Sequence, residues 1–439
     1  MGFLKTTGRI FYILGLALLI FIGVLFIIYV GPSIWKKWVT YPRLERERAE
    51  LWQNYKKPPV LIPLVSHKGV MHSHTYWSHD SGGVLPEILN GAKKAKLEFI
   101  FLSDHPHGKL DSFPRSYHGI FDGIIIEAGT ETSNGLMVQP FDTTVLDWNL
   151  PFDEIIHDIV ADGGLVTYVH TEKEHPWGNP DYQAMEIYNI HTDLLDEDGI
   201  LPFIINSTIN GKQYRHWGFR ELYNDQTAIW AKWDSLNQHR RIVGIGAVDA
   251  HNNNSFKARY LNDGKVEWIG PNNDSLSIKE PGLLEKLLLG EPDKFGWAFK
   301  WEMDPYFNSF NHVNDHVFCD TFSNVNIKDN IIKGHLFVAF ESLAEADGFQ
   351  YFSTNSQNQL TAILGDSASS ANAHYLKAVS PFPVRFQLYN SGQLINETEG
   401  SYAYEFNLDG KPGNYRLAAS LWLDEKWIPW ILTNPIFVY

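Results

Sequence analysis

The chain has 439 residues and a formal net charge of −15, and 44% of its residues are hydrophobic. This length is enough for two or three domains and a sizeable core. The acidic charge argues against nucleic acid as a partner, because binding to a phosphate backbone needs a basic face. The single cysteine, Cys319, excludes an internal disulfide and a cysteine-based zinc ribbon.

The first predicted element is a transmembrane helix in the N-terminal segment, residues 1–40. Residues 10–30 contain no charged side chain, and a helix of this length covers about 30 Å, the thickness of one bilayer core. Trp35 and Trp38 lie beside Lys36 and Lys37, as in an interfacial belt. A signal peptide usually has a shorter apolar region and a small-residue cleavage site. We therefore expect one uncleaved, single-pass anchor.

The orientation of this anchor is set by the short N-terminal arm. Basic residues stand on both sides of the apolar segment, so the positive-inside rule nearly cancels. A short N-terminal arm easily stays on the cytoplasmic side of the membrane. We therefore expect the body of the protein to be extracytoplasmic.

Residues 41–59 are charged and are predicted to form a helical stalk, which ends at Pro58 and Pro59. From residue 60 to about residue 251, apolar strand-like runs alternate with helical patterns. Repeated strand-then-helix units predict an α/β fold with a parallel sheet, which is either open or closed into a barrel.

Residues of metal-binding type recur where the predicted strands end. They are Asp104 with His105, Glu131, His170, Glu186, and Asp249 with His251. In parallel α/β folds, this edge of the sheet is where sites are built. Five strand ends that each offer such a residue are difficult to attribute to chance.

The segment that follows residue 69 adds His72 and His74, on either side of Ser73. Residues i and i+2 of a strand face the same side, so we expect these two imidazoles to point together. Asp249 and His251 have the same spacing. Glu131 has two carboxylate oxygens and is suited to bridge two cations. The pattern therefore predicts a metal site rather than ordinary surface histidines.

The motifs His-Ser-His, Ser-Asp-His, Gly-Thr-Glu, Tyr-Val-His and Asp-Ala-His, in this order, resemble the polymerase and histidinol phosphatase (PHP) superfamily over residues 69–252. The resemblance implies a distorted (β/α)7 barrel that holds two or three divalent ions, usually zinc, manganese or iron. It also implies hydrolysis, most often of phosphoesters. One branch of the superfamily resembles carbaryl hydrolase, so the ester need not be a phosphate.

The resemblance implies the following metal ligands: His72, His74, Asp80, His105, Glu131, His170, Asp249 and His251. His79 competes with Asp80, and Glu127 is the less favoured rival of Glu131. The catalytic residues that it implies are His251 and His170, as proton donors to the leaving group, and Asp104, which would orient a neighbouring ligand. No further cofactor is expected.

The sequence departs from the family pattern between Glu131 and His170. Many relatives carry another ligand histidine soon after the glutamate, where this chain has Leu136 and Met137. Either His157 reaches the site instead, or one metal position is weak or empty.

Other polar residues have two interpretations each. His175 either binds substrate or is structural, and Glu186 is more readily an outer partner of the site than a ligand. The segment with Arg215, His216 and Arg220 either recognises an anionic substrate or forms a solvated helix face. Asn206 begins a glycosylation sequon, which has meaning only in a eukaryotic secretory context.

Residues 255–335 look irregular, and from about residue 337 short aromatic and β-branched runs predict an antiparallel β-sandwich. The expected division is therefore an anchor (1–40), a stalk (41–59), a metallohydrolase domain (60–335) and a β-sandwich (336–439). We expect a membrane-anchored metal-dependent hydrolase that acts on a small, anionic phosphoric ester. The alternatives are a carboxylic or carbamic ester hydrolase and a catalytically weak, membrane-tethered binding protein.

Overall fold

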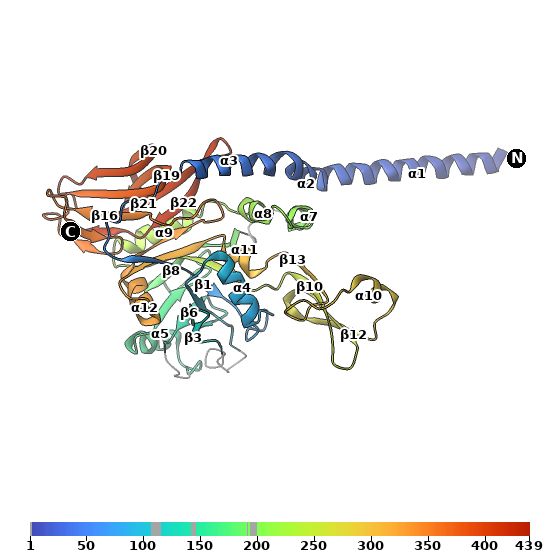
Figure 1. The fold of residues 1–439 in the computed structure, drawn as a ribbon, viewed down its shortest axis with the longest axis horizontal. Coiled ribbons are helices and arrows are strands. Elements are labelled where there is room, and N and C mark those ends of the chain that lie inside the picture. The colour runs from blue at the N-terminus through green and yellow to red at the C-terminus, as the bar shows by residue number, and fades with distance from the viewer. Residues whose placement is uncertain (1, 107–115, 142–145, 191, 194–199) are drawn as a thin grey trace.

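The computed structural model describes residues 2–106, 116–141, 146–190, 192–193 and 200–439. It has a mixed α/β architecture with a large central sheet. Helix α1 (Gly2–Tyr29) extends away from the body (Figure 1). Its window Tyr12–Tyr29 has a mean hydropathy of 2.8 and is not buried by the rest of the protein, so by length and composition it would cross a bilayer.

The predicted stalk is helical, but it packs against the body. Helices α2 (Gly31–Trp35) and α3 (Tyr41–Gln53) are joined by a π-helical turn, η1 (Lys36–Thr40). The Tyr41 side chain is fully buried, and its hydroxyl donates to Glu221 over 3.0 Å. Arg43 forms an ion pair with Asp424 at 2.5 Å. These contacts attach α3 to two different parts of the body.

The strands of the N-terminal half form the parallel part of the sheet. They are β1 (Val65–Ser73), β2 (Phe99–Leu102), β4 (Ile124–Glu127), β7 (Leu165–Tyr168), β8 (Ala184–Asn189) and β9 (Val243–Ala250). Strand β1 is parallel to β2 and β9, and the pairs β2–β4, β7–β8 and β8–β9 are also parallel. Helices follow in the gaps: α4 (Leu85–Ala95), α5 (Phe152–Ala161), α7 (Ile200–Asn210), α8 (Arg215–Glu221) and α9 (Thr227–Asn237).

The alternation is interrupted between β4 and β7, where the sequence pattern predicted only parallel strands. Strand β3 (Gly119–Phe121) pairs antiparallel with β4, and β6 (Leu136–Gln139) pairs antiparallel with both β5 (Thr130–Glu131) and β7. Between β5 and β6 the reversal is a tight turn at Gly135, whose φ of +73° lets the chain turn back without a crossover helix.

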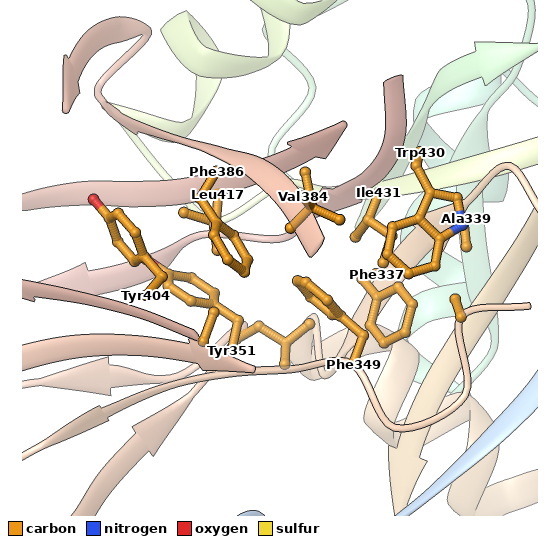
Figure 2. Close-up of a cluster of buried hydrophobic side chains, with 14 of the residues drawn as sticks. Phe337, Ala339, Phe349, Tyr351, Val384, Phe386, Tyr404, Leu417, Trp430 and Ile431 are labelled. Carbon is orange, nitrogen blue, oxygen red and sulfur yellow. The ribbon is translucent and has the colours of Figure 1, made fainter. Parts of the chain in front are cut away.

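The C-terminal part is mainly antiparallel. Its strands are β14 (Asn314–Cys319), β15 (Leu336–Ala339), β16 (Gln350–Thr354), β17 (Leu360–Ile363), β18 (Ser367–Ala368), β19 (Tyr375–Asn390), β20 (Gln393–Asn407), β21 (Gly413–Leu423), β22 (Lys426–Thr433) and β23 (Ile436–Val438), with α12 (Asn324–Lys333) between β14 and β15. Strand β14 pairs with β1, and β15 pairs with β22, so the two halves share hydrogen-bonded strands. Figure 2 shows the aromatic core beneath them, which includes Phe337, Tyr351 and Trp430.

The expectation that residues 255–335 are irregular is wrong. They contain a separate four-stranded antiparallel sheet in the order β12-β11-β10-β13. Its elements are β10 (Ser255–Tyr260), β11 (Val266–Ile269), β12 (Ser275–Lys279), α10 (Leu283–Leu288) and β13 (Phe299–Glu302), followed by α11 (Tyr306–Phe310). Strands β10, β12 and β13 do alternate polar and apolar residues, but each has only four to six residues, too few to stand out from the polar sequence around them. We call residues 255–302 the insert.

Candidate metal centre

The parallel strands bring their carboxyl ends to one place. Ser73 at the end of β1 is paired with Ala250 at the end of β9. The amide of His74 donates to the carbonyl of Ala250 over 2.9 Å, and the amide of Ser103 donates to Ser73 over 2.9 Å. The polar residues that follow these strands therefore meet in space although they are distant in the chain.

Two groups of side chains meet there, and within each group one ligand atom per residue lies within 4.8 Å of all the others. The first group is His74, Asp80, His105 and His251. Oδ2 of Asp80 lies 3.1 Å from Nε2 of His251 and 3.5 Å from Nε2 of His105. This geometry favours Asp80 over His79 as the ligand-type residue of its segment.

The second group is His72, His74, Glu131 and Asp249. Nε2 of His72 lies 2.9 Å from Oε2 of Glu131 and 3.2 Å from Oδ1 of Asp249. His74 belongs to both groups. The other oxygen of Glu131, Oε1, lies 3.1 Å from Nε2 of His170, as expected for a carboxylate that bridges neighbouring positions. The structure thus brings all eight predicted ligand residues together.

The two histidines of β1 converge by a different route from the one that the sequence suggested. The strand register shifts between Met71 and Ser73, and His72 has a left-handed backbone with φ of 61°. His170 (φ 52°) and Asp249 (φ 42°) share this conformation. Such a conformation costs about 1–3 kcal/mol per residue and is concentrated at functional sites. The backbone is therefore bent at three of the eight residues to aim their side chains.

Hydrogen-bond partners at Nδ1 fix three of the imidazole rings. Nδ1 of His74 lies 3.1 Å from the Ser78 hydroxyl, Nδ1 of His105 lies 3.0 Å from the carbonyl of Glu131, and Nδ1 of His251 lies 3.0 Å from the carbonyl of Asp249. Because each Nδ1 is used in this way, each Nε2 faces the cluster. This is the arrangement of ligand histidines in metal sites.

Charge is concentrated in the cluster. Burial lowers the pKa of His72, but Asp249, Glu131 and Glu186 raise it well above its usual value. Burial also opposes protonation of His251, yet Asp249 and Asp80 raise its pKa to about 9. The pKa of Glu131 lies well below its usual value, despite burial, because imidazoles surround it, chiefly His72. The carboxylates thus require positive charge beside them, which protons or cations supply.

The donor set fits divalent metal ions. Nitrogen from imidazole and oxygen from carboxylate are the ligands of zinc, manganese and iron sites. Oδ1 of Asp80 is buried, and among the described residues it has no hydrogen-bond partner. A buried carboxylate oxygen without a donor is costly unless a cation faces it.

Asp104 stands apart from the cluster. It is fully buried, and its carboxylate accepts hydrogen bonds from the amide and hydroxyl of Thr75 (2.5 and 2.9 Å) and from Ser116 (2.7 Å). The cavity described below is lined without it. Its carboxylate thus holds Thr75, the neighbour of the predicted ligand His74, which is compatible with the orienting role predicted for Asp104; that role stays a prediction.

The remaining candidates lie outside the cluster. His157 is on the exposed side of α5, 3.1 Å from Asp181, so it does not supply the ligand missing after Glu131. The rival carboxylate Glu127 contacts His118 and Asn324. His175 stacks on Tyr168. His157, Glu127 and His175 are all absent from the described residues that line the cavity beside the cluster.

The basic segment on α8 also serves the structure. His216 pairs with Glu45 of α3 at 2.7 Å, and the Arg220 guanidinium lies 3.8 Å from the centre of the Tyr223 ring. Asn206 is buried and donates to the hydroxyl of Tyr41, so the sequon is inaccessible in the folded protein.

A cavity of about 690 Å³ opens beside the cluster. Its polar wall includes the carboxylates and imidazoles, and Lys173 is the one Lys or Arg side chain among its described lining residues. Its other wall is apolar and consists of Ile190, Phe203, Phe219, Leu222, Val248 and Met303. Sequence reasoning missed Lys173, which lies in the turn after His170, and this apolar wall, because none of these residues carries a motif.

Comparison with known proteins gives no family assignment. No family model matches the chain, and no curated protein matches it. Among solved structures, it is similar to a two-domain protein from Bacteroides vulgatus that contains a predicted PHP-like metal-dependent phosphoesterase. The identity is 11% and the TM-score 0.32, and the alignment covers 87% of this chain and 98% of that one. At these values the likeness carries no argument, and function has to be argued from the site.

Proposed function

We propose that this protein is a metal-dependent hydrolase, and most specifically a phosphoesterase of the PHP type. The observation that carries the proposal is the meeting of eight ligand-type side chains at one sheet edge, beside a cavity large enough for a small ester. Such an assembly of buried carboxylates and imidazoles costs stability, which favours a chemical role for it.

The two groups would hold divalent ions, zinc, manganese or iron; His74, which is common to both, would be a ligand to one of them, since an imidazole nitrogen has one lone pair. Divalent cations supply Lewis acidity, which activates water and polarises an ester. A third ion would need His170, which is adjacent to Glu131 and Asp249, since the described residues supply no histidine in place of the one missing after Glu131.

The protein's own residues would bind the ester and supply protons. Lys173 lies in the cavity, where its ammonium group would attract an anionic substrate. His170 and His251 also line the cavity, and either would protonate the departing oxygen.

The finer architecture is also part of the proposal. Strand pairing runs without a break through β2, β1, β9, β8, β7, β6 and β5, and an isolated bridge joins Asp104 to Thr130. This order supports a distorted (β/α)7 barrel. We further propose that the strands after residue 335 form a sandwich, with the domain limits given above, and that α1 is a single-pass anchor with the body outside the cytoplasm.

The test is a metal-reconstitution assay on the full chain in detergent. After chelation, manganese or zinc is added and turnover of p-nitrophenyl phosphate and of its bis-ester is measured. His72→Ala and Asp249→Ala should each abolish metal-dependent turnover, whereas His157→Ala, which changes an exposed histidine of α5, should not. Unchanged turnover in the first two variants contradicts the proposal.

The apolar wall of the cavity favours one alternative, a neutral carboxylic or carbamic ester as substrate. Turnover of p-nitrophenyl acetate and of a naphthyl carbamate in the same assay distinguishes a carboxylic or carbamic ester hydrolase from a phosphoesterase. Stoichiometric metal without turnover of any ester would instead support a membrane-tethered binding protein.

A further inference from the structure

The cavity beside the metal centre has two chemically different walls. A ligand whose ester group reaches Asp80 and Glu131 would have the rest of its surface against Phe203 of α7, Phe219 of α8 and Met303. Apolar walls reward burial of hydrocarbon, while the cluster and Lys173 suit an anion. The cavity as a whole therefore suits an amphiphile.

The helix that supplies Phe203 is bound directly to the segment that leaves the apolar helix α1. The Asn210 side chain donates to the carbonyl of Ser33 over 2.9 Å, and Nζ of Lys37 donates to the carbonyl of Ile209 over 3.3 Å. Figure 1 shows α7 and α8 at the end of the body from which α1 emerges. On the same helix, 48% of the Leu201 side chain is exposed. The apolar wall is thus at the end of the body that the anchor would hold against a bilayer.

A second apolar surface lies on the insert. We call it the leucine tip, and it consists of Leu276, Ile278, Leu283, Leu287 and Leu288. Leu283 is 89% exposed and Leu287 is 80% exposed. Figure 1 shows α10 and β12 extending from the body in the same direction as α1. Exposed apolar patches of this kind mark interaction surfaces, and the common direction with α1 identifies the bilayer as the occupant.

The insert also contributes to the cavity. Asp274, just before β12, and Met303, just after β13, line it together with Phe203 of α7. The cavity is therefore lined both from α7, which carries the exposed Leu201, and from the ends of the insert strands, which carry the leucine tip.

We propose, resting on the proposed function, that the substrate is a phosphoester carried by a membrane lipid, which enters the cavity from the bilayer between α7 and the insert. In the reaction, the oxygen of water bonds to phosphorus, the P–O bond to the departing alcohol breaks, and the alcohol oxygen takes a proton. The acyl chains remain against the apolar wall or in the bilayer.

The first test compares lipid and headgroup substrates for the full chain in mixed micelles with manganese. Dioctanoyl phosphatidic acid is compared with glycerol 3-phosphate, and dioctanoyl phosphatidylglycerol with glycerophosphoglycerol. We expect kcat/KM to be about tenfold or more higher for at least one lipid, because remote apolar contacts lower the barrier. In Phe203→Asp this ratio should fall towards one. Equal kcat/KM for lipids and headgroups in the unaltered protein overturns the inference.

The second test measures the membrane contact without any turnover. Because Cys319 is fully buried, a cysteine placed at Leu283 can be labelled selectively with an environment-sensitive fluorophore. In nanodiscs with brominated phosphatidylcholine, the label in Leu283→Cys should be quenched. The matched control is Glu399→Cys, an exposed position of β20. Figure 1 shows β20 on the far side of the body from α10. Equal quenching at the two positions overturns the bilayer contact.

The two proposals fail in different ways. Metal-dependent turnover of bis(p-nitrophenyl) phosphate without a preference for lipids refutes the lipid inference and leaves the hydrolase proposal intact. Absence of metal-dependent turnover on every ester refutes the hydrolase proposal itself, and the lipid inference with it.

Discussion

Nδ1 of His72 lies 2.5 Å from Oε1 of Glu186, and both side chains are buried. The second oxygen of Glu186 accepts hydrogen bonds from the amide of His170 (2.7 Å) and from the side chain of Asn189 (2.9 Å). One carboxylate on β8 thus sets the orientation of one ligand histidine and the backbone of another. Nε2 of His72 is left to face Glu131 and Asp249.

This relationship predicts that Glu186→Gln weakens metal binding by about 10- to 100-fold without unfolding the protein, as loss of a ligand-orienting partner does in other metal sites. The measurement is the Kd for zinc by competition with a chelating dye. Glu174→Gln, an exposed change nearby, is the control and should leave Kd unchanged. An unaltered Kd in Glu186→Gln would show that His72 does not need this partner.

Metal should also stabilise the fold, because the cluster gathers carboxylates that need neighbouring positive charge. A ligand that binds only the folded state adds about 2.7 kcal/mol when its concentration is a hundred times Kd. We expect the thermal midpoint to fall on chelation and to recover with manganese, and Asp249→Asn to lose most of this response. A midpoint that ignores chelation would argue against a metal site.

A buried ionic group joins β1 to the C-terminal part of the chain. Glu341 is paired with His316 at 2.8 Å and also with Lys68. Burial opposes ionisation of Glu341, but His316 and Lys68 lower its pKa to about 2. Because this pKa is below the unfolded value of about 4.5, the group stabilises the fold above about pH 5, by roughly 3 kcal/mol.

That stabilisation should disappear as the pH falls from about 5 towards 2. In Glu341→Gln the free energy of unfolding should be lower than in the unaltered protein at pH 7, and the difference should shrink at pH 3. Urea unfolding at the two pH values measures it. A difference that stays constant with pH would mean that the loss comes from packing and not from charge.

Gly83 has no room for a side chain. A Cβ there would lie 1.7 Å from the hydroxyl of Tyr306, which donates to the carbonyl of His74 over 2.6 Å. We expect Gly83→Ala to destabilise the protein by about 1–3 kcal/mol and to reduce ester turnover, because the loop after His74 must shift. Gly178→Ala is the control, since among the described residues no heavy atom lies within 4 Å of its added Cβ.

The sequence predicts the cluster better than it predicts the surroundings. His72, Glu131 and His251 each follow an apolar strand, so their location follows from local pattern and from the rule that parallel strands end together. The left-handed turn at His72 has no such signal, since nothing in the local pattern marks it. Phe203 reaches the cavity only through packing between distant elements, which periodicity does not encode. Lys173 lies in the turn after His170, but a single lysine carries no motif. The insert was missed because its strands are only four to six residues long.

The attachment of α3 to the body has a mechanical consequence. Tyr41 is hydrogen-bonded to Glu221 and Arg43 is paired with Asp424, so α3, which follows the apolar helix α1, is fixed to two separate parts of the body. With α1 in a bilayer, as proposed above, the body would not rotate freely about a flexible linker. Its height and tilt above the lipid would be constant, and it would meet its substrates only in a thin layer next to the headgroups.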